Sequence, residues 1–152
     1  MQLTFDQFKE LVTLAFGSQN AKLSRAEAEA IVAIAGLAVD VDQQEDASEV
    51  SLFDSLASHV CALAGISGNP VEAPVRAVDD ALGDQLRELG EPLRGKPSGK
   101  LAYIVGYLLA VVDQQLAPEE SEFVEMLRYA LDLDEPTSDE LAAEASAVLT
   151  EG

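Results

Sequence analysis

The stretch Val41-Asp42-Gln43-Gln44 returns later in the chain as Val112-Asp113-Gln114-Gln115. The two copies are separated by 113 − 42 = 71 residues, and the same shift places Glu49 on Glu120. Apolar positions also coincide without a gap, with Ala35 on Gly106, Leu52 on Phe123 and Leu56 on Leu127. Four identical residues in a row, followed by a matching acid, indicate an internal duplication. We therefore predict two helix pairs related by an approximate twofold axis.

The sequence on either side of each acidic turn has helical character. The run from Leu101 to Val112 is hydrophobic nearly all round, so it should form a central buried helix. Pro118 suits the first position of the helix that follows. We expect the two repeats to cover about residues 24–64 and 98–133.

Capping boxes indicate where further helices begin, because their Ser or Thr and the Glu or Gln three residues later satisfy free backbone amides. The chain has three such pairs: Thr4 with Gln7, Ser24 with Glu27, and Thr137 with Glu140. Gly17 is expected to end the first helix, and a more polar helix is expected over residues 75–89. No alternating strand pattern is present. The predicted fold is a single all-α domain over residues 1–152, a bundle of about seven helices.

Composition narrows the classes of function. The formal net charge is −19, from 28 acidic and 9 basic side chains, which repels nucleic acid and attracts cations and basic protein partners. The single cysteine, Cys61, excludes an intramolecular disulfide. The longest apolar run is far shorter than the roughly 20 residues that span a bilayer. With no signal peptide recognised at the N-terminus, a cytoplasmic location is expected.

The duplicated acids are the candidate functional residues: Asp42 and Glu49 in the first repeat, and Asp113 and Glu120 in the second. In each repeat the two acids are seven residues apart, yet a helix–turn–helix can bring them face to face. The competing interpretation is purely structural, because acids near a helix N-terminus are stabilised by capping and by the helix dipole.

These residues resemble the TerB family, the helical domain associated with tellurite resistance. The stretch from Ala110 to Glu120, followed by Phe123, resembles the family's helix–acidic turn–Pro-Glu-Glu pattern, and the resemblance covers about residues 25–135. It implies an all-α domain with two pseudo-symmetric halves, clustered acids that bind a divalent metal, and a role in stress response, sensing or protein interaction. Carried over by position, the metal ligands would be Asp42, Glu49, Asp113 and Glu120. Ligation by carboxylate oxygens alone suits Ca²⁺ or Mg²⁺ better than softer metals. The family's usual Gly after the Asp is replaced here by Gln43 and Gln114. Because Gln resists a left-handed turn, the replacement weakens the expectation of metal binding.

Three other motifs are weaker. The segment from Asp40 to Ser51 imitates an EF-hand loop but lacks the central Gly and the bidentate acid. Asp54-Ser55-Leu56 copies the phosphopantetheine attachment triplet, yet Ser55 is expected in mid-helix rather than at a helix start. His59 and Cys61 are expected to be a half-buried helix residue and a small core residue, on different sides of one helix.

The sequence thus favours a non-enzymatic, TerB-like acidic module that binds a divalent cation, a protein partner with a basic surface, or both. Two alternatives stay open. One is a carboxylate–metal hydrolase that uses the same four acids. The other is a structural or assembly protein whose basic segment, Arg94 to Lys100, contacts the acidic face of another subunit.

Overall fold

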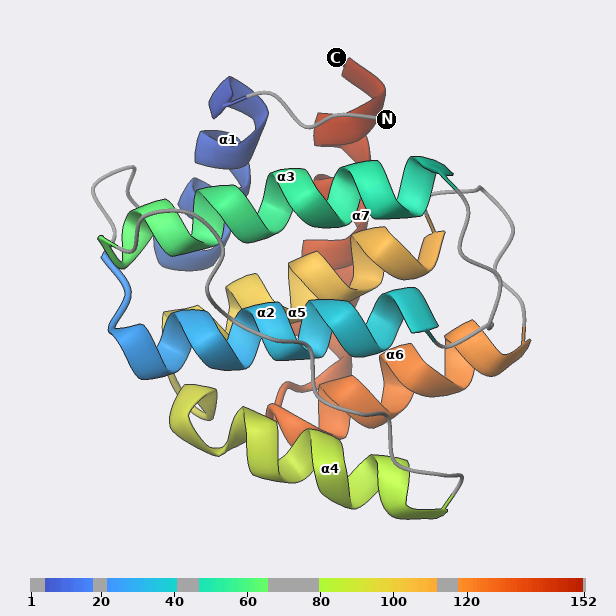
Figure 1. Cartoon of the computed structure of the whole chain (residues 1–152). Coiled ribbons are helices and arrows are strands. Elements are labelled where there is room, and N and C mark those ends of the chain that lie inside the picture. The colour runs from blue at the N-terminus through green and yellow to red at the C-terminus, as the bar shows by residue number, and fades with distance from the viewer. Residues whose placement is uncertain (1–4, 18–21, 41–46, 66–79, 112–117, 152) are drawn as a thin grey trace.

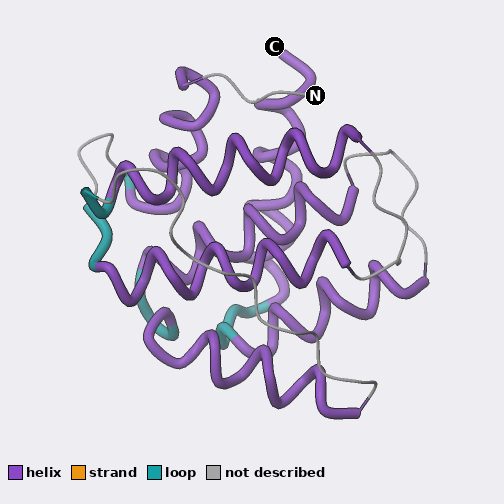
Figure 2. The backbone as a smooth tube through the Cα atoms, in the orientation of Figure 1, coloured by secondary structure: helices purple, strands orange, loops and turns teal. Residues whose placement is uncertain are grey.

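A computed structural model describes residues 5–17, 22–40, 47–65, 80–111 and 118–151 of the chain. The described residues contain helices and turns but no strand (Figures 1 and 2). The elements are α1 (Phe5–Phe16), α2 (Arg25–Asp40), α3 (Ala47–Leu63), α4 (Asp80–Gly90), the 3-10 turn η1 (Glu91–Leu93), α5 (Pro97–Val111), α6 (Pro118–Ala130) and α7 (Glu135–Glu151). The predicted all-α bundle of about seven helices is confirmed.

Helix α5 lies at the centre of the bundle, as its apolar sequence predicts. It packs against α1, α2, α6 and α7, while α2 also packs against α3. Residues 101–106 of α5 are all buried. The first position of α6 is Pro118, as expected, and α5 itself begins at Pro97, one residue before the Ser98 of the expected second repeat. The largest fully buried side chains come from six of the seven helices and η1: Phe8, Leu11, Ile31, Ile34, Leu37, Leu56, Leu86, Leu93, Leu101, Ile104 and Phe123.

The helix boundaries on both sides of the acidic turns follow the shift seen in the sequence. Helix α2 ends at Asp40 and α5 at Val111, a difference of 111 − 40 = 71. Helix α3 begins at Ala47 and α6 at Pro118, and 118 − 47 is again 71. Each connection therefore spans six residues, 41–46 and 112–117. The overlay of the two halves in space stays a prediction.

Helices α2 and α5 run in the same direction through the bundle, and each is followed by a helix that returns (Figure 1). A glycine permits the close contact among α2, α5 and α6. A Cβ atom on Gly106 would lie 2.5 Å from Leu127 Cδ2 and 3.8 Å from Ile34 Cγ2. Glycine within a helix costs about 0.5–1 kcal/mol relative to alanine. We infer that this residue is tolerated because it leaves room for the side chains of the neighbouring helices.

The capping box at the start of α2 forms as predicted. The Ser24 amide donates to Glu27 Oε1 at 3.0 Å, and the Glu27 amide donates to Ser24 Oγ at 3.1 Å. Partial burial acts to raise the pKa of Glu27, but interactions with Ser98, Ser24 and Lys96 outweigh it, so the pKa lies below its usual 4.5. The buried Ser98 hydroxyl lies near this carboxylate without a well-formed hydrogen bond, so we assign the main stabilisation to Ser24.

This capping box should make stability pH-dependent. Because the pKa of Glu27 is lowered by folding, its contribution is fully present above pH 4.5 and is lost as the pH falls through the lowered value. Replacing Glu27→Gln keeps an acceptor but removes the charge, which should cost roughly 0.3–1 kcal/mol at pH 7. Urea unfolding of both proteins from pH 7 to pH 3 should show that this difference vanishes in acid. A difference that is constant with pH would contradict the assignment.

The start of α7 corrects one prediction. The helix begins at Glu135 rather than after Thr137, and its N-cap is Asp134, whose Oδ1 accepts the Thr137 amide at 2.9 Å. Hydrogen bonding from the Thr137 side chain, and then from its amide, lowers the pKa of Asp134 below its usual range. Pro136 favours the earlier start because it has no amide that would remain unsatisfied in the first turn. The predicted Thr137–Glu140 box is therefore wrong.

The remaining predictions of helix ends have different outcomes. Gly17 has φ of 74° and its amide donates to Thr13 O at 2.7 Å, so it ends α1 as predicted. Thr4 of the first capping box lies outside the described residues. Of the helix expected over residues 75–89, the structure describes α4 from Asp80 onward, and the residues before it lie outside the described part.

The basic segment after α4 is partly used inside the chain. Arg94 Nε donates to Ala130 O at 2.9 Å, and its Nη2 donates to Arg87 O at 2.7 Å. Its guanidinium therefore joins α4 to the C-terminal end of α6, where it satisfies carbonyl groups left free by the helix. This internal role leaves less of the segment available for the subunit contact considered from the sequence.

Candidate functional site

The four predicted ligands fall at the two helix junctions. Asp42 and Asp113 lie outside the described residues. Glu49 and Glu120 are each the third residue of their helix, α3 and α6. Their backbones are thus in the first helical turn, as predicted, while their side chains lie outside the described part. The structure does not test whether the four carboxylates approach one another.

The described backbone brings the ends of the four relevant helices to one end of the bundle. In Figure 1 the C-terminal ends of α2 and α5 and the N-terminal ends of α3 and α6 all lie at the right-hand side. Both helix pairs are in direct contact, α2 with α3 and α5 with α6, and α2 also contacts α5. Acids in the first turns of α3 and α6 are favoured by the positive ends of the helix dipoles. The two junctions therefore share one end of the molecule.

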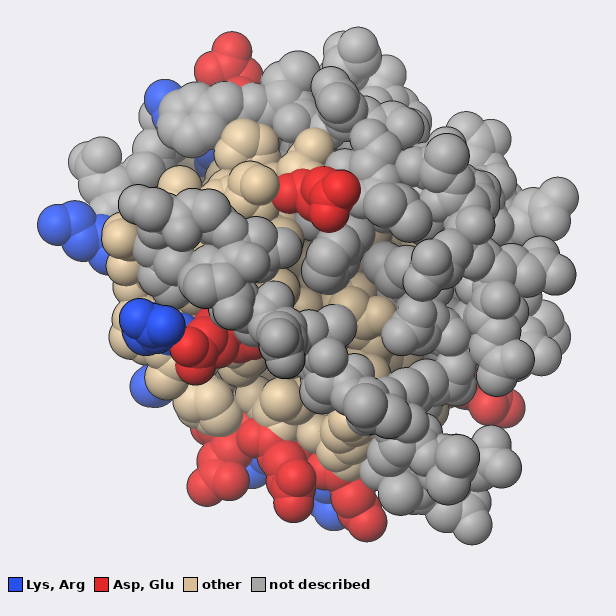
Figure 3. Space-filling view, viewed as in Figure 1, with Lys and Arg blue, Asp and Glu red and all other residues tan. Residues whose placement is uncertain are grey.

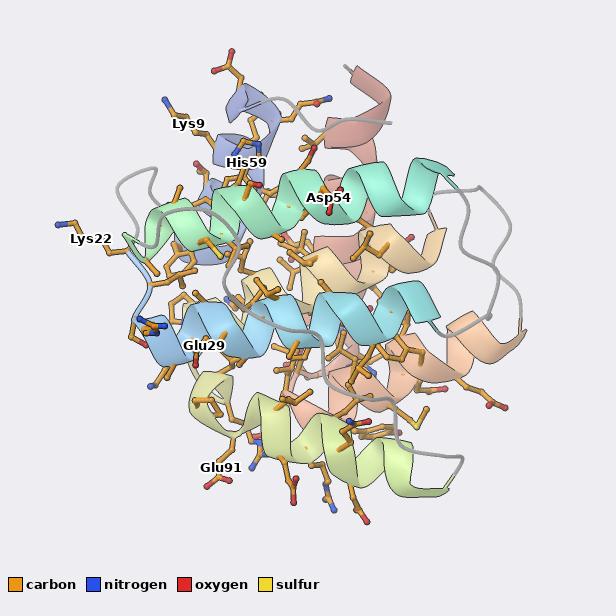
Figure 4. All side chains as sticks on the ribbon, in the orientation of Figure 1. Lys9, Lys22, Glu29, Asp54, His59 and Glu91 are labelled. Carbon is orange, nitrogen blue, oxygen red and sulfur yellow. The ribbon has the colours of Figure 1, made fainter. Side chains whose placement is uncertain are left out.

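Elsewhere, the described acids are dispersed. Asp54 on α3, Glu29 on α2 and Glu91 on η1 project from separate elements without converging (Figure 4). Among the side chains that the structure describes, no three His, Cys, Asp or Glu residues are grouped so that they could hold a metal ion. Figure 3 shows acidic side chains with a few basic ones over α4, at the lower edge of the view. This mixed surface contributes no metal-ligand set.

The side chains that could act as a nucleophile or a base lie in positions typical of structural residues. His59 is half-buried on α3, and its ring stacks on Phe8 of α1 with centroids 5.0 Å apart. Cys61 is fully buried, and burial raises the pKa of its thiol, which disfavours the reactive thiolate. Ser55 is the ninth residue of α3, not the start of a helix. These observations confirm the structural interpretation of His59 and Cys61 and the expected mid-helix position of Ser55.

Two surface grooves were not predicted. The first has a volume of about 410 Å³ between α4, η1 and α6 and is lined by Arg87, Glu88, Glu91, Arg94, Tyr129 and Asp132. The second has a volume of about 250 Å³ between α5, α6 and α7, and its lining includes Tyr103, Tyr107, Arg128, Glu135, Ser138 and Asp139. We call the second the α5–α7 groove. The sequence contained one signal for it, the four-residue spacing of Tyr103 and Tyr107, which indicated only packing.

The tyrosines of the α5–α7 groove do pack, as expected. Their rings stack with centroids 6.3 Å apart. Burial raises the pKa of Tyr103, against a smaller opposing effect of Ser138, so its phenol stays protonated at neutral pH. Ser146 Oγ donates to the Tyr107 hydroxyl at 3.5 Å, which connects the aromatic pair to α7.

Comparison of the chain with models of protein families, with curated proteins and with solved structures found no match. The TerB-like assignment therefore depends on the residues quoted from the sequence and stays a prediction. None of the helices in the described ranges has both the length and the apolar character needed to cross a membrane.

Proposed function

We propose that this protein is a non-enzymatic, TerB-like helical module that binds a divalent cation at its two duplicated helix junctions. The ligands would be Asp42 and Glu49 at one junction and Asp113 and Glu120 at the other. The observation that carries this proposal is the repeated junction itself. Both connections have the same length, both are followed by a helix with a Glu at its third position, and the four helix ends that they join lie at one end of the bundle (Figure 1).

The chemistry of the acids supports a hard cation. Four carboxylates offer oxygen ligands only, which is the preference of Ca²⁺ and Mg²⁺. The formal net charge of −19 also raises the local concentration of cations around the whole chain. A bound cation would reduce the repulsion among acids that the duplication places at one end of the molecule.

Calorimetric titration with Ca²⁺, Mg²⁺, Mn²⁺ and Zn²⁺ tests this function. We expect Ca²⁺ or Mg²⁺ to bind, and we expect the double variant Asp42→Asn/Asp113→Asn to bind about tenfold more weakly or worse, a loss of about 1.4 kcal/mol or more. The matched control is Glu140→Gln/Glu144→Gln, which removes the same charge from exposed positions of α7. Thermal unfolding should show that both variants are folded.

Two outcomes would change the proposal. If the two double variants bind cations with equal affinity, cation binding depends only on net charge. The remaining interpretation would be an acidic docking surface for a basic protein partner. If the native chain hydrolyses phosphoesters in a metal-dependent way and Asp42→Asn/Asp113→Asn does not, the protein is a carboxylate–metal hydrolase and not a non-enzymatic module. The TerB resemblance supports a biological role in stress response or sensing, in which cation binding would alter the contact with a protein partner.

A further inference from the structure

The α5–α7 groove combines aromatic surface with acidic side chains, and it is separate from the two helix junctions. The stacked pair Tyr103 and Tyr107 contributes to its lining from α5. Glu135 and Asp139 line it from the first two turns of α7. Aromatic rings attract cations through the negative faces of their π systems, and carboxylates add direct charge attraction. The groove is thus complementary to a positively charged group with an apolar stem.

Arg128, which also lines the groove together with Glu125, already forms the same kinds of contact. The Arg128 guanidinium lies 4.4 Å from the centroid of the Tyr129 ring, and its Nη2 is 3.7 Å from Glu125 Oε1. Its Nη1 also donates to Leu133 O at 3.3 Å. These contacts provide Arg128 and Glu125 with internal partners. By contrast, within the described part of the chain neither Glu135 nor Asp139 forms an ion pair through its side chain.

The volume of the α5–α7 groove limits the size of the ligand that it can bind. Pockets for drug-sized ligands have volumes of roughly 300–1,000 Å³, whereas this groove has about 250 Å³. It therefore suits one small head group rather than a large planar ligand. The buried Tyr103 and Ser138, 4% and 1% exposed, contribute little accessible surface to it.

From this arrangement we infer that the α5–α7 groove binds an alkylammonium group, with its carbon chain against the half-buried Tyr107, which stacks on the buried Tyr103, and its charge beside Glu135 and Asp139. The shared chemistry belongs to a free polyamine and to a lysine side chain of a protein partner. This inference does not depend on the proposed cation site, because the two sites have no residue in common.

Intrinsic tyrosine fluorescence offers a direct readout, because the chain has three tyrosines and no tryptophan. In a Tyr129→Phe background only Tyr103 and Tyr107 remain. We expect n-butylammonium chloride to cause a saturable change in their emission, while sodium chloride at equal ionic strength does not. EDTA in the buffer removes any contribution from divalent cations at the helix junctions.

Paired variants provide the decisive comparison. Glu135→Gln/Asp139→Asn should weaken n-butylammonium binding roughly tenfold, because both carboxylates beside the ammonium group lose their charge and each exposed ion pair contributes modestly. The control Glu140→Gln/Glu144→Gln removes the same charge from exposed positions of the same helix and should leave binding nearly unchanged. Equal weakening in both, or an emission change with sodium chloride equal to that with n-butylammonium, would overturn the inference.

Two further probes distinguish the source of the ammonium group. Spermidine binding more tightly than n-butylammonium would support a polyamine ligand. A Gly-Lys-Gly peptide that is acetylated only at its N-terminus keeps the lysine ammonium group. If it binds more tightly than the matching Gly-Arg-Gly peptide, the result would support a lysine side chain of a protein partner as the ligand. If n-butylammonium, spermidine and the lysine peptide all leave the emission unchanged, an alkylammonium site is contradicted.

Discussion

Replacing Phe123→Ala is expected to lower the free energy of unfolding by about 3–5 kcal/mol. The Phe123 side chain on α6 is fully buried, and its ring lies near Gly106 of the central helix α5. Truncation removes apolar contacts and leaves a cavity that the neighbouring helices cannot fill completely. Since the free energy of unfolding of natural domains is only about 5–15 kcal/mol, this single change would remove a large part of the protein's stability.

Urea unfolding followed by far-UV circular dichroism measures the effect. The control is Tyr129→Ala on the same helix, because this side chain is 67% exposed and its ring contacts the Arg128 guanidinium. We expect the control to cost less than about 1 kcal/mol. Similar losses in Phe123→Ala and Tyr129→Ala would contradict the placement of α6 against α5.

The second large effect is expected at Gly99, near the start of α5. A Cβ atom there would lie 2.6 Å from the carbonyl oxygen of Leu93 in η1. The obstacle is backbone and cannot rotate away, so Gly99→Ala must displace η1 or the first turn of α5. We expect a loss of about 1–3 kcal/mol, the usual range for overpacking.

Gly83 of α4 offers a matched control with the opposite sign. A Cβ atom there would meet only Met126 Sδ at 3.8 Å, an ordinary contact. Because glycine is a poor helix former, Gly83→Ala should stabilise the protein by about 0.5–1 kcal/mol. Thermal unfolding of the two variants side by side checks both signs. Stabilisation by Gly99→Ala would mean that η1 and α5 are farther apart than described.

The sequence predicts most of the fold because its strongest signals are local. The Ser24–Glu27 box depends only on residues three apart, and the buried character of α5 follows from a continuous apolar run. The Thr137 box failed because a competing local signal, Asp134 before Pro136, starts α7 earlier. The hydrogen bonds of Arg94 to α4 and α6 were not predictable, because they depend on which helix ends are neighbours in space.

The candidate site is predictable to a smaller extent. The duplication fixes which helix ends should correspond, and the described boundaries agree with it on both sides of each turn. Whether Asp42 and Asp113 face Glu49 and Glu120 depends on backbone angles within the two connections, which periodicity does not encode. The α5–α7 groove was missed for a related reason, since its tyrosines lie on α5 and its acids Glu135 and Asp139 lie on α7, and α6 separates these two helices in the sequence.

Paramagnetic broadening by Mn²⁺ is the most direct test of cation binding at the duplicated junctions. In amide-resolved spectra, substoichiometric Mn²⁺ should first broaden signals at the ends of α2 and α5 and at the starts of α3 and α6, and excess Mg²⁺ should reverse the effect. Broadening spread over the exposed acids of α4 and α7, with the junction signals no more affected than the rest, would contradict the account.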